Sequence, residues 1–324
     1  GVIDPRKVLT LVGEENIDAW TVGIENGRST EDIVKQYAPN ATITDYSLHT
    51  IDSYLSRTPQ QIKEFIRDGL DRPYIPGSSI KGAMRTAVLA SIAATMDEAE
   101  LSRVTKNNGN ITAKVFEAKV FGKDPNHDVF RYLLVGDAFA TGYRTAVYNM
   151  VNINERTERG FWDTSKQMAT EVLLSGTEVD FSLVLKQPEL RPADMPAMPK
   201  ALSSVNALLN VINNHTRTLL ANEIEIWESK NVDSQSEEKV NSYIEQLKDL
   251  LNTANECKGT LSAVMRIGHG SGWRFITGAW TERLSDNEFG AVVNKARPGN
   301  AKRYADYDFP KSRRLEEDEC EPLG

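Results

Sequence analysis

The strongest constraint on the fold is a proline–glycine–serine loop that leads directly into an alanine-rich stretch. Proline disfavours helix at the residue before it, so Ile75 is expected to be extended, while Gly77 and the two serines after it suit a turn and a helix N-cap. Residues 80–96 contain no proline and one glycine, which predicts a helix. A loop therefore feeds a helix start here, and we expect the chain to be organised around that helix.

The start of this helix is a candidate anion site. Free backbone N–H groups and the positive end of the helix dipole favour a negative ligand, and Lys81 and Arg85 lie four residues apart on one face. A phosphate suits this combination best, and ordinary capping beside two solvated cations is the alternative. The stretch is not a P-loop, because Ala83 and Met84 stand where that motif requires Lys and Ser or Thr.

The composition is that of an ordinary globular protein. The chain has 324 residues, of which 40% are hydrophobic and 26% charged, enough for about two domains. A net charge of −8 argues against a protein that coats nucleic acid with its whole surface, but it is compatible with a local basic groove. Cys257 and Cys320 are far apart, so we expect no zinc site or disulfide scaffold, and a reduced, cytoplasmic setting fits. No long apolar run is present, so no membrane partner is expected.

Sequence periodicity predicts the α+β class, because one helical region is followed by several strands. Helices are expected at residues 30–70 (two, the second from residue 58), 114–120, 202–229 and 236–254. Strands are expected at residues 129–135, 144–153 and 177–185. Prolines near residues 188–199 predict a stiff connector. We expect the two long helices after it to pack in the core, and a partner-binding surface is the alternative.

A second candidate site is a glycine-rich stretch near the C-terminus. It alternates glycine with polar residues and closes on a ring and a cation: Gly268, His269, Gly270, Ser271, Gly272, Trp273 and Arg274. It is not a dinucleotide fingerprint, since the third glycine of that motif and a strand–helix unit are both missing. Its bare backbone permits close approach of a sugar–phosphate chain, with a ring available for stacking. A tight turn between packed elements is the alternative.

A short basic cluster lies close to the end of this acidic chain. It contains Lys311, Arg313 and Arg314 and is followed by four acidic residues at positions 316–319. Such clusters are usually solvated, and the acidic run can neutralise this one locally.

Together these stretches resemble the RAMP superfamily, the RNA-binding subunits of type III CRISPR effector complexes. The first resemblance is Ile75-Pro76-Gly77-Ser78-Ser79-Ile80-Lys81-Gly82 followed by Arg85, and the second is the strand at residues 130–137 that ends in Asp137. The glycine loop and the ending at residues 310–315 and 322–324 are similar to the tail of the Csm-type subunit that caps the complex. Residues 20–70 match only loosely, so no role is transferred there. The family normally extends beyond both ends of this chain, so we expect both ends to be incomplete.

The resemblance implies tandem ferredoxin-like (RRM-like) modules with a helical insertion. The expected division is an N-terminal ferredoxin-like domain at residues 1–190, a helical segment at 191–258 and a C-terminal part at 259–324 with the glycine loop. The implied role is to hold the 3′ portion of a CRISPR RNA at the head of a type III-A filament, contributing to CRISPR RNA maturation and antiviral defence. Implied partners are the repeated backbone subunit, the small helical subunit and target RNA, with a host trimming nuclease as a further candidate.

The resemblance also implies which residues lie against RNA. Carried over from the family motifs are Gly77, Ser78, Ser79, Lys81, Arg85, Gly270 and Gly272. Their neighbours Gly268, His269, Ser271, Trp273, Arg274, Lys311, Arg313 and Arg314 complete the expected RNA-binding set.

The sequence predicts no catalytic residue, metal site or cofactor. The four histidines are scattered, and none has a partner at metal-ligand spacing. His269 is the one candidate for acid–base chemistry, with a phosphate or packing contact as the alternative. Asp137 suits turn capping better than catalysis. We therefore expect a non-catalytic RNA-binding subunit, with a metal-independent endoribonuclease that processes CRISPR RNA as the alternative.

Overall fold

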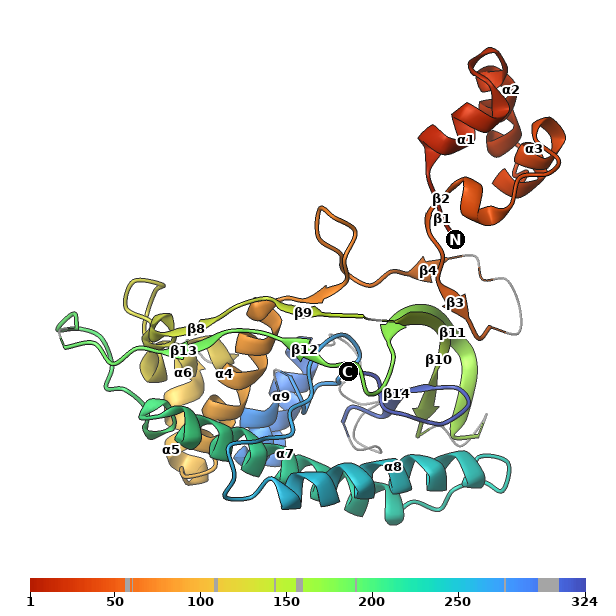
Figure 1. The fold of residues 1–324 in the computed structure, drawn as a ribbon. Helices are drawn as coiled ribbons and strands as arrows, with labels where there is room; N and C mark the ends of the chain where they lie inside the picture. The colour runs from red at the N-terminus through yellow and green to blue at the C-terminus, as the bar shows by residue number, and fades with distance from the viewer. Residues whose placement is uncertain are drawn as a thin grey trace.

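The computed structural model describes residues 1–55, 59, 61–107, 110–142, 144–155, 160–189, 191–276, 278–296 and 309–324. A small N-terminal lobe stands apart from a larger body of helices and strands (Figure 1). The lobe contains α1 (Pro5–Val12), α2 (Ile17–Glu25) and α3 (Thr30–Tyr37) around a small apolar cluster. Ser29 caps α3 by accepting from the Asp32 N–H at 3.1 Å, which confirms the first helix predicted within residues 30–70.

A thin connection joins the lobe to the body. In it β1 (Val2–Ile3) pairs antiparallel with β2 (Ser47–His49), and the chain continues through β3 (Asp52–Ser53) and β4 (Ile62–Lys63). The helix predicted from residue 58 to about 69 is wrong, since β4 pairs in parallel with β11 of the body. Residues 58 and 60 lie outside the described residues.

The first part of the body is a curled sheet. Its order is β14 (Ser312–Glu316), β10 (Thr145–Asn154), β11 (Trp162–Leu173) and β4, and β3 pairs with β10 as well. One face packs on the long helices α7 (Val205–Glu228) and α8 (Glu237–Glu256) through a cluster that includes Ile153, Leu315 and Trp227. Strand β10 and both long helices confirm predictions, whereas β11 was not predicted.

The second part of the body is a long ladder of short strands. In it β8 (Leu133–Val135) pairs with β13 (Leu183–Leu185), and β9 (Ala138–Ala140) pairs with both β12 (Val179–Asp180) and β5 (Tyr74–Ile75). The strand predicted at residues 129–135 begins instead as a 3-10 turn at Val129–Tyr132. The strand predicted at residues 177–185 forms as two pieces, β12 and β13, and residues 181 and 182 between them belong to neither strand.

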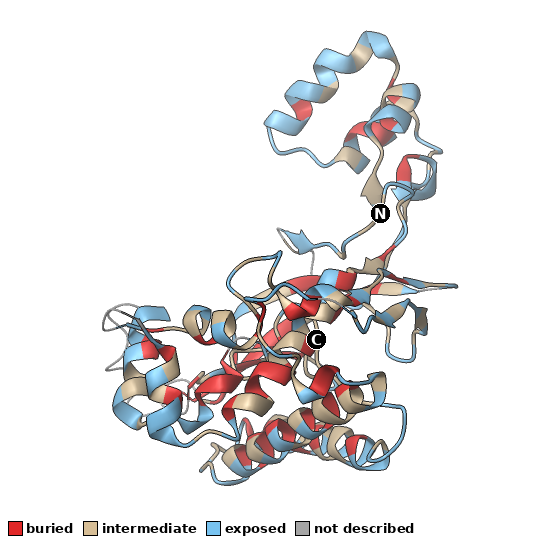
Figure 2. Cartoon of the chain, turned by 90° about the vertical axis from the view of Figure 1, so that its left-hand side faces the viewer, coloured by how far each residue is buried: buried red, intermediate tan, exposed pale blue. Residues whose placement is uncertain are grey.

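Helices fill one side of this ladder. They are α4 (Gly77–Ala93), α5 (Glu98–Thr105), α6 (Ala113–Val120) and α9 (Asp286–Ala296), and a small hairpin of β6 (Lys106–Asn107) and β7 (Asn110–Ile111) joins α5 to α6. The first half of α7 shares their core, which includes Ile80, Phe116 and Leu133. Buried residues gather along these helices and the curled sheet, and they are sparse in the lobe (Figure 2).

The α+β class is therefore confirmed, while tandem ferredoxin-like modules and the division at residues 190 and 258 stay predictions. Within the described part of the chain, no helix is long and apolar enough to cross a membrane.

Candidate nucleic-acid interface

The start of α4 is closed by a carboxylate of the protein itself. The helix begins at Gly77, three residues earlier than predicted, so Ser78 and Ser79 are exposed residues of its first turn and not its cap. The Gly77 N–H donates to Asp137 Oδ1 at 2.7 Å. A Cβ at Gly77 would lie 2.5 Å from the Gly136 carbonyl oxygen, so only glycine fits. The Asp137 carboxylate therefore accepts from the backbone N–H that was expected to bind a phosphate. Its role is to cap the helix.

The two cations of this turn differ in what they contact. Arg85 donates to Asp128 at 2.8 Å and to Glu117 at 3.2 Å, and its guanidinium lies 4.1 Å from the Phe121 ring centre. Arg85 thus braces α4 against α6 and the turn after it, and its contact with RNA stays a prediction. Lys81 forms no ion pair with any described residue; partial burial and then Arg85 lower its pKa, and Asp128 opposes them.

Strand alternation separates the two arginines of β14. Arg313 points into the helical core, is 7% exposed, and pairs with Glu223 on α7, with Nη2 and Oε2 3.0 Å apart. Its other donors go to Glu223 and the Pro310 carbonyl. Successive strand residues face opposite sides of a sheet, so the expectation that Arg313 contacts RNA is corrected to a structural role.

Glu223 completes this buried cluster. It also accepts from Trp227 Nε1 at 2.8 Å and from the Tyr243 hydroxyl at 3.0 Å. Burial by itself would raise the pKa of Glu223, but Arg313 and these hydrogen bonds outweigh it and hold the pKa low. The cluster joins α7, α8 and β14 at the centre of the body.

The glycine loop is a tight turn with one exposed side chain. Its three glycines have φ of +91°, +84° and +86°, which glycine adopts without strain. A Cβ at Gly270 would meet Leu323 at 2.7 Å, and the buried Ser271 donates to the Gly268 carbonyl at 2.8 Å. The loop is therefore held against the C-terminal segment, in the way that the tight-turn alternative describes.

The residues after the loop are used in packing. Trp273 meets the Phe309 ring edge-on with centres 5.5 Å apart, and Arg274 donates to the Phe309 carbonyl at 3.2 Å. Lys311 is half-buried beside β14. Contacts of these three residues with RNA stay predictions.

The structure brings His269 and Arg314 together with Lys63, a residue that the sequence did not single out. Arg314 leaves β14 on the face opposite to Arg313 and reaches Met168 of β11, with Nη1 and Sδ 3.9 Å apart. Lys63 lies at the far edge of the same sheet, opposite Thr170 of β11. We call Lys63, His269 and Arg314 the cationic face.

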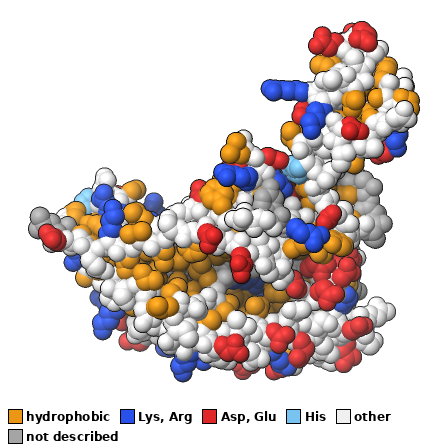
Figure 3. Space-filling view, viewed as in Figure 1, with side chains coloured by type: hydrophobic (Ala, Val, Ile, Leu, Met, Phe, Trp, Pro, Cys, Tyr) orange, Lys and Arg blue, Asp and Glu red, His pale blue; other side chains and the backbone are white. Residues whose placement is uncertain are grey.

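The two charged members of the cationic face, Lys63 and Arg314, lie beside His269 and have no ion-pair partner among the described carboxylates. Burial and then Arg314 lower the pKa of Lys63. Burial, Lys63 and Arg314, in that order, lower the pKa of His269. Neither Lys63 nor Arg314 forms an ion pair with a described residue. Acidic side chains instead line the lower edge of the body, over α7 and α8 (Figure 3).

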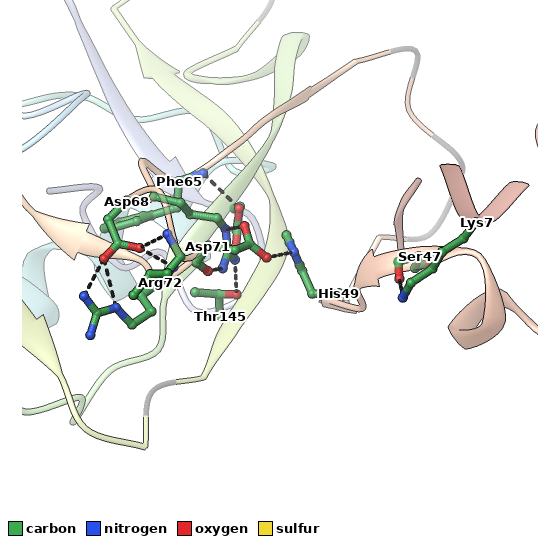
Figure 4. A network of polar contacts seen from close by, with 11 residues as sticks. Lys7, Ser47, His49, Phe65, Asp68, Asp71, Arg72 and Thr145 are labelled. Carbon is green, nitrogen blue, oxygen red and sulfur yellow. Dashed lines mark hydrogen bonds and ion pairs between the residues drawn. The ribbon is translucent and has the colours of Figure 1, made fainter. Parts of the chain in front are cut away.

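A polar network holds the segment that follows Lys63 (Figure 4). Glu171 of β11, only 2% exposed, accepts from the Phe65 N–H at 2.9 Å and forms an ion pair with Arg67. Asp71 Oδ2 then lies 2.5 Å from Nδ1 of His49, in β2 of the connection to the lobe. The segment that follows Lys63 is thereby pinned to β11. No signal in the sequence pointed to Lys63, because β4 is two residues long and depends on a partner more than 100 residues away.

Comparisons with known proteins show the family and the fold. A sequence model of the RAMP superfamily matches residues 26–275. The chain belongs to the RAMP superfamily. This confirms the resemblance drawn from the motifs at residues 75–85 and 268–273.

Two solved structures share the fold. One is a chain of a Csm–crRNA–target RNA ternary complex of a type III-A CRISPR–Cas system, with a TM-score of 0.72 and 20% identity over 100% of this chain and 90% of that one. The other is Csm5 of T. onnurineus, with a TM-score of 0.58 and 19% identity over 99% of this chain and 90% of that one. No curated protein sequence matches the chain.

Proposed function

We propose that this protein is an RNA-binding structural subunit of a type III-A CRISPR complex and that it holds the RNA backbone on its cationic face. The observation that carries the proposal is the convergence of Lys63, His269 and Arg314 from three distant segments with no carboxylate partner among the described residues. A fold gains nothing from placing like charges together, whereas a phosphate chain neutralises them.

The glycine loop and α4 take smaller parts in this proposal. The loop presents His269 and leaves its backbone open at Gly272, where a Cβ would meet nothing within 4 Å. Lys81, Ser78 and Ser79 form a second, weaker contact point, while Arg85 holds α4 in place. Contacts of this kind position a nucleic acid without reading its sequence.

We place the subunit at the 3′-end side of the CRISPR RNA, as a cap on the filament that contributes to RNA maturation and antiviral defence. The likeness to a chain from a Csm–crRNA–target RNA complex supports a role in such a complex. The resemblance of the glycine loop and of residues 310–315 to the tail of the capping subunit supports the position. The proposed neighbours are the backbone subunit, the small helical subunit and target RNA, and a trimming nuclease would act on the RNA end that this subunit leaves exposed.

The proposed role is non-catalytic. No described histidine, cysteine or carboxylate belongs to a group that could hold a metal ion. Apart from burial, the described groups that shift the pKa of His269 are the cations Lys63 and Arg314, and no described carboxylate forms an ion pair with it, whereas acid–base catalysis relies on a positioned group whose pKa lies near the working pH. Incubating the purified protein with labelled precursor RNA tests this role. Cleavage that is lost in His269→Ala would replace our proposal with the endoribonuclease alternative.

The binding proposal is tested in the assembled complex. Lys63→Glu combined with Arg314→Glu is expected to reduce the amount of CRISPR RNA retained or to shorten its 3′ end. The control is Lys119→Glu combined with Lys258→Glu, which makes the same change in net charge at exposed positions outside the cationic face. It is expected to retain RNA of the same amount and length as the wild-type protein. Equal RNA occupancy and length in both double variants would contradict the proposal.

A further inference from the structure

Two stacked tyrosines lie on the curled sheet. The rings of Tyr54 and Tyr148 have centres 4.8 Å apart and planes inclined by 18°. Tyr54 is 54% exposed although Tyr148 covers one side of its ring. The remaining side of the Tyr54 ring therefore forms an exposed aromatic surface, on which a second flat ring could stack.

The pair is held in place by the sheet. Tyr148 belongs to β10, and the Tyr54 N–H donates to the Val147 carbonyl at 3.0 Å directly after β3 joins the edge of β10. An exposed ion pair between Asp52 and Arg144, at 3.0 Å, closes the same end. The platform is thus preorganised and does not have to be assembled when a ligand arrives.

The tyrosine pair and the cationic face share one side of the sheet. Tyr148 lies opposite Thr170 of β11, and Thr170 lies opposite Lys63 of β4. Residues paired across strands point to the same side, and two strand spacings amount to about 10 Å. Arg314 is opposite Asn152, four residues further along β10 on that side.

The charges around the tyrosines suit a base better than a phosphate. The pKa of Tyr148 is raised by burial first, and then by Tyr54, Glu316 and Glu321, and Arg144 opposes them. Because Arg144 is itself paired with Asp52, the unpaired charges near the Tyr148 hydroxyl are carboxylates. Carboxylates repel a phosphate, but a nucleobase is uncharged and stacks on a ring. Phosphates are thereby directed to Lys63 and Arg314, and the base to the tyrosines.

In a second aromatic pair the ring is less open, since Phe139 is 36% exposed against 54% for Tyr54. Phe139 stacks on Tyr74 with centres 5.5 Å apart, and the Arg72 guanidinium lies 5.2 Å from the centre of the same Phe139 ring. Two side chains of its own fold therefore contact the Phe139 ring, which makes this residue a control for Tyr54.

We propose that Tyr54 and Tyr148 form a stacking platform for an unpaired RNA base whose flanking phosphates lie on the cationic face. This inference rests on the proposed RNA-binding function and adds a contact to the bases. A groove of cations beside an aromatic platform is how proteins bind single strands with little sequence preference. Because the base has to leave its own stack, the site is expected to prefer single-stranded over double-stranded RNA.

The test compares two probes on the purified full chain: a single-stranded oligoribonucleotide and an abasic sugar–phosphate chain of the same length. Tyr54→Ala is expected to weaken binding of the oligoribonucleotide by at least about fivefold and to leave the abasic chain unchanged. Tyr54→Phe keeps the ring and is expected to retain wild-type affinity, as is Phe139→Ala.

Three results would overturn the platform: unchanged binding in Tyr54→Ala, equal weakening of both probes, or loss of affinity in Tyr54→Phe. These results are separable from failure of the proposed function. If the proposed function itself fails, the wild-type protein binds both probes no more tightly than the Lys63→Glu, Arg314→Glu double variant does. The residue at position 54 then makes no difference.

Discussion

The start of α4 and the cationic face contain similar parts, but the fold treats them differently. Both combine glycine-bearing backbone with two basic side chains. At α4, Asp137 takes a free backbone donor, and Glu117 and Asp128 pair with Arg85. At the cationic face no described carboxylate pairs with Lys63 or Arg314, and burial first and then these two cations lower the pKa of His269.

This difference shows that a basic motif predicts nucleic-acid binding only when the fold leaves its charge uncompensated. The same contrast occurs within two consecutive residues of β14. Arg313 is bound to Glu223 in the core, and Arg314 faces away on the other side of the sheet. The predictions below test this distinction, in order of expected effect.

The largest effect is expected at the buried ion pair between Glu223 and Arg313. Glu223→Ala leaves Arg313 charged, buried and unpaired, and such a loss typically costs about 3–5 kcal/mol of unfolding free energy. Chemical denaturation measures it, and Glu225→Ala, an exposed neighbour on α7, is expected to change stability by less than about 0.5 kcal/mol. If Glu223→Ala left stability unchanged and weakened RNA binding, the structural role of Arg313 would be contradicted and the earlier prediction that it contacts RNA would be supported.

A smaller effect is expected at the α4 cap. Asp137→Ala removes the acceptor for the Gly77 N–H, and loss of a helix cap costs about 1 kcal/mol. Thermal unfolding measures the change. RNA affinity of the folded variant should not fall, since the lost group is anionic. A loss of RNA affinity or of RNA cleavage with intact stability would show that Asp137 has a functional role beyond capping.

Salt dependence distinguishes the two regions by the number of phosphates that each contacts. The double variant Lys63→Ala, Arg314→Ala is expected to reduce the slope of log affinity against log salt by about 1.4, because each phosphate contact to a single strand contributes about 0.7. Lys81→Ala is expected to reduce it by about 0.7 or less. Filter binding of a single-stranded RNA at several salt concentrations gives these slopes, and a reversed order would break the comparison.

The smallest effect is a pH dependence that arises from His269. In the free protein its pKa is lowered, so the ring is neutral near pH 7, whereas a bound phosphate would favour the protonated ring and raise that pKa. RNA should therefore bind more tightly as pH falls through the raised value, by about two- to fivefold between pH 8 and 5.5. The His269→Gln variant should lack this change. A pH dependence that persists in the variant would assign the effect to another group.

Local patterns in the sequence were enough to predict the helices and strands whose apolar residues recur with a clear period. Helices α6, α7 and α8 and strand β10 lie within three residues of the predictions. The glycine loop was also recognisable, because three alternating left-handed residues require glycine. The turn at Gly77 was recognised as a helix start, but the carboxylate that closes it comes from residue 137 and was not predicted as its partner.

The elements that were missed depend on distant partners. Strand β4 has two residues and exists because β11 offers an edge, so Lys63 had no local signal. Strand β11 contains a polar stretch around residues 164–166 that hides its alternation. Arg313 and Arg314 could have been separated by the period of two, had residues 312–316 been recognised as a strand.

The central claim is that uncompensated cations mark the RNA site, and the most direct measurement is the affinity of a single-stranded RNA for two charge reversals. Arg314→Glu is expected to weaken binding at least about tenfold at moderate salt, because it turns an attractive contact into a repulsive one. Lys81→Glu carries the same charge change at the start of α4 and is expected to weaken binding less than about threefold. Equal losses, or a larger loss in Lys81→Glu, would contradict the account.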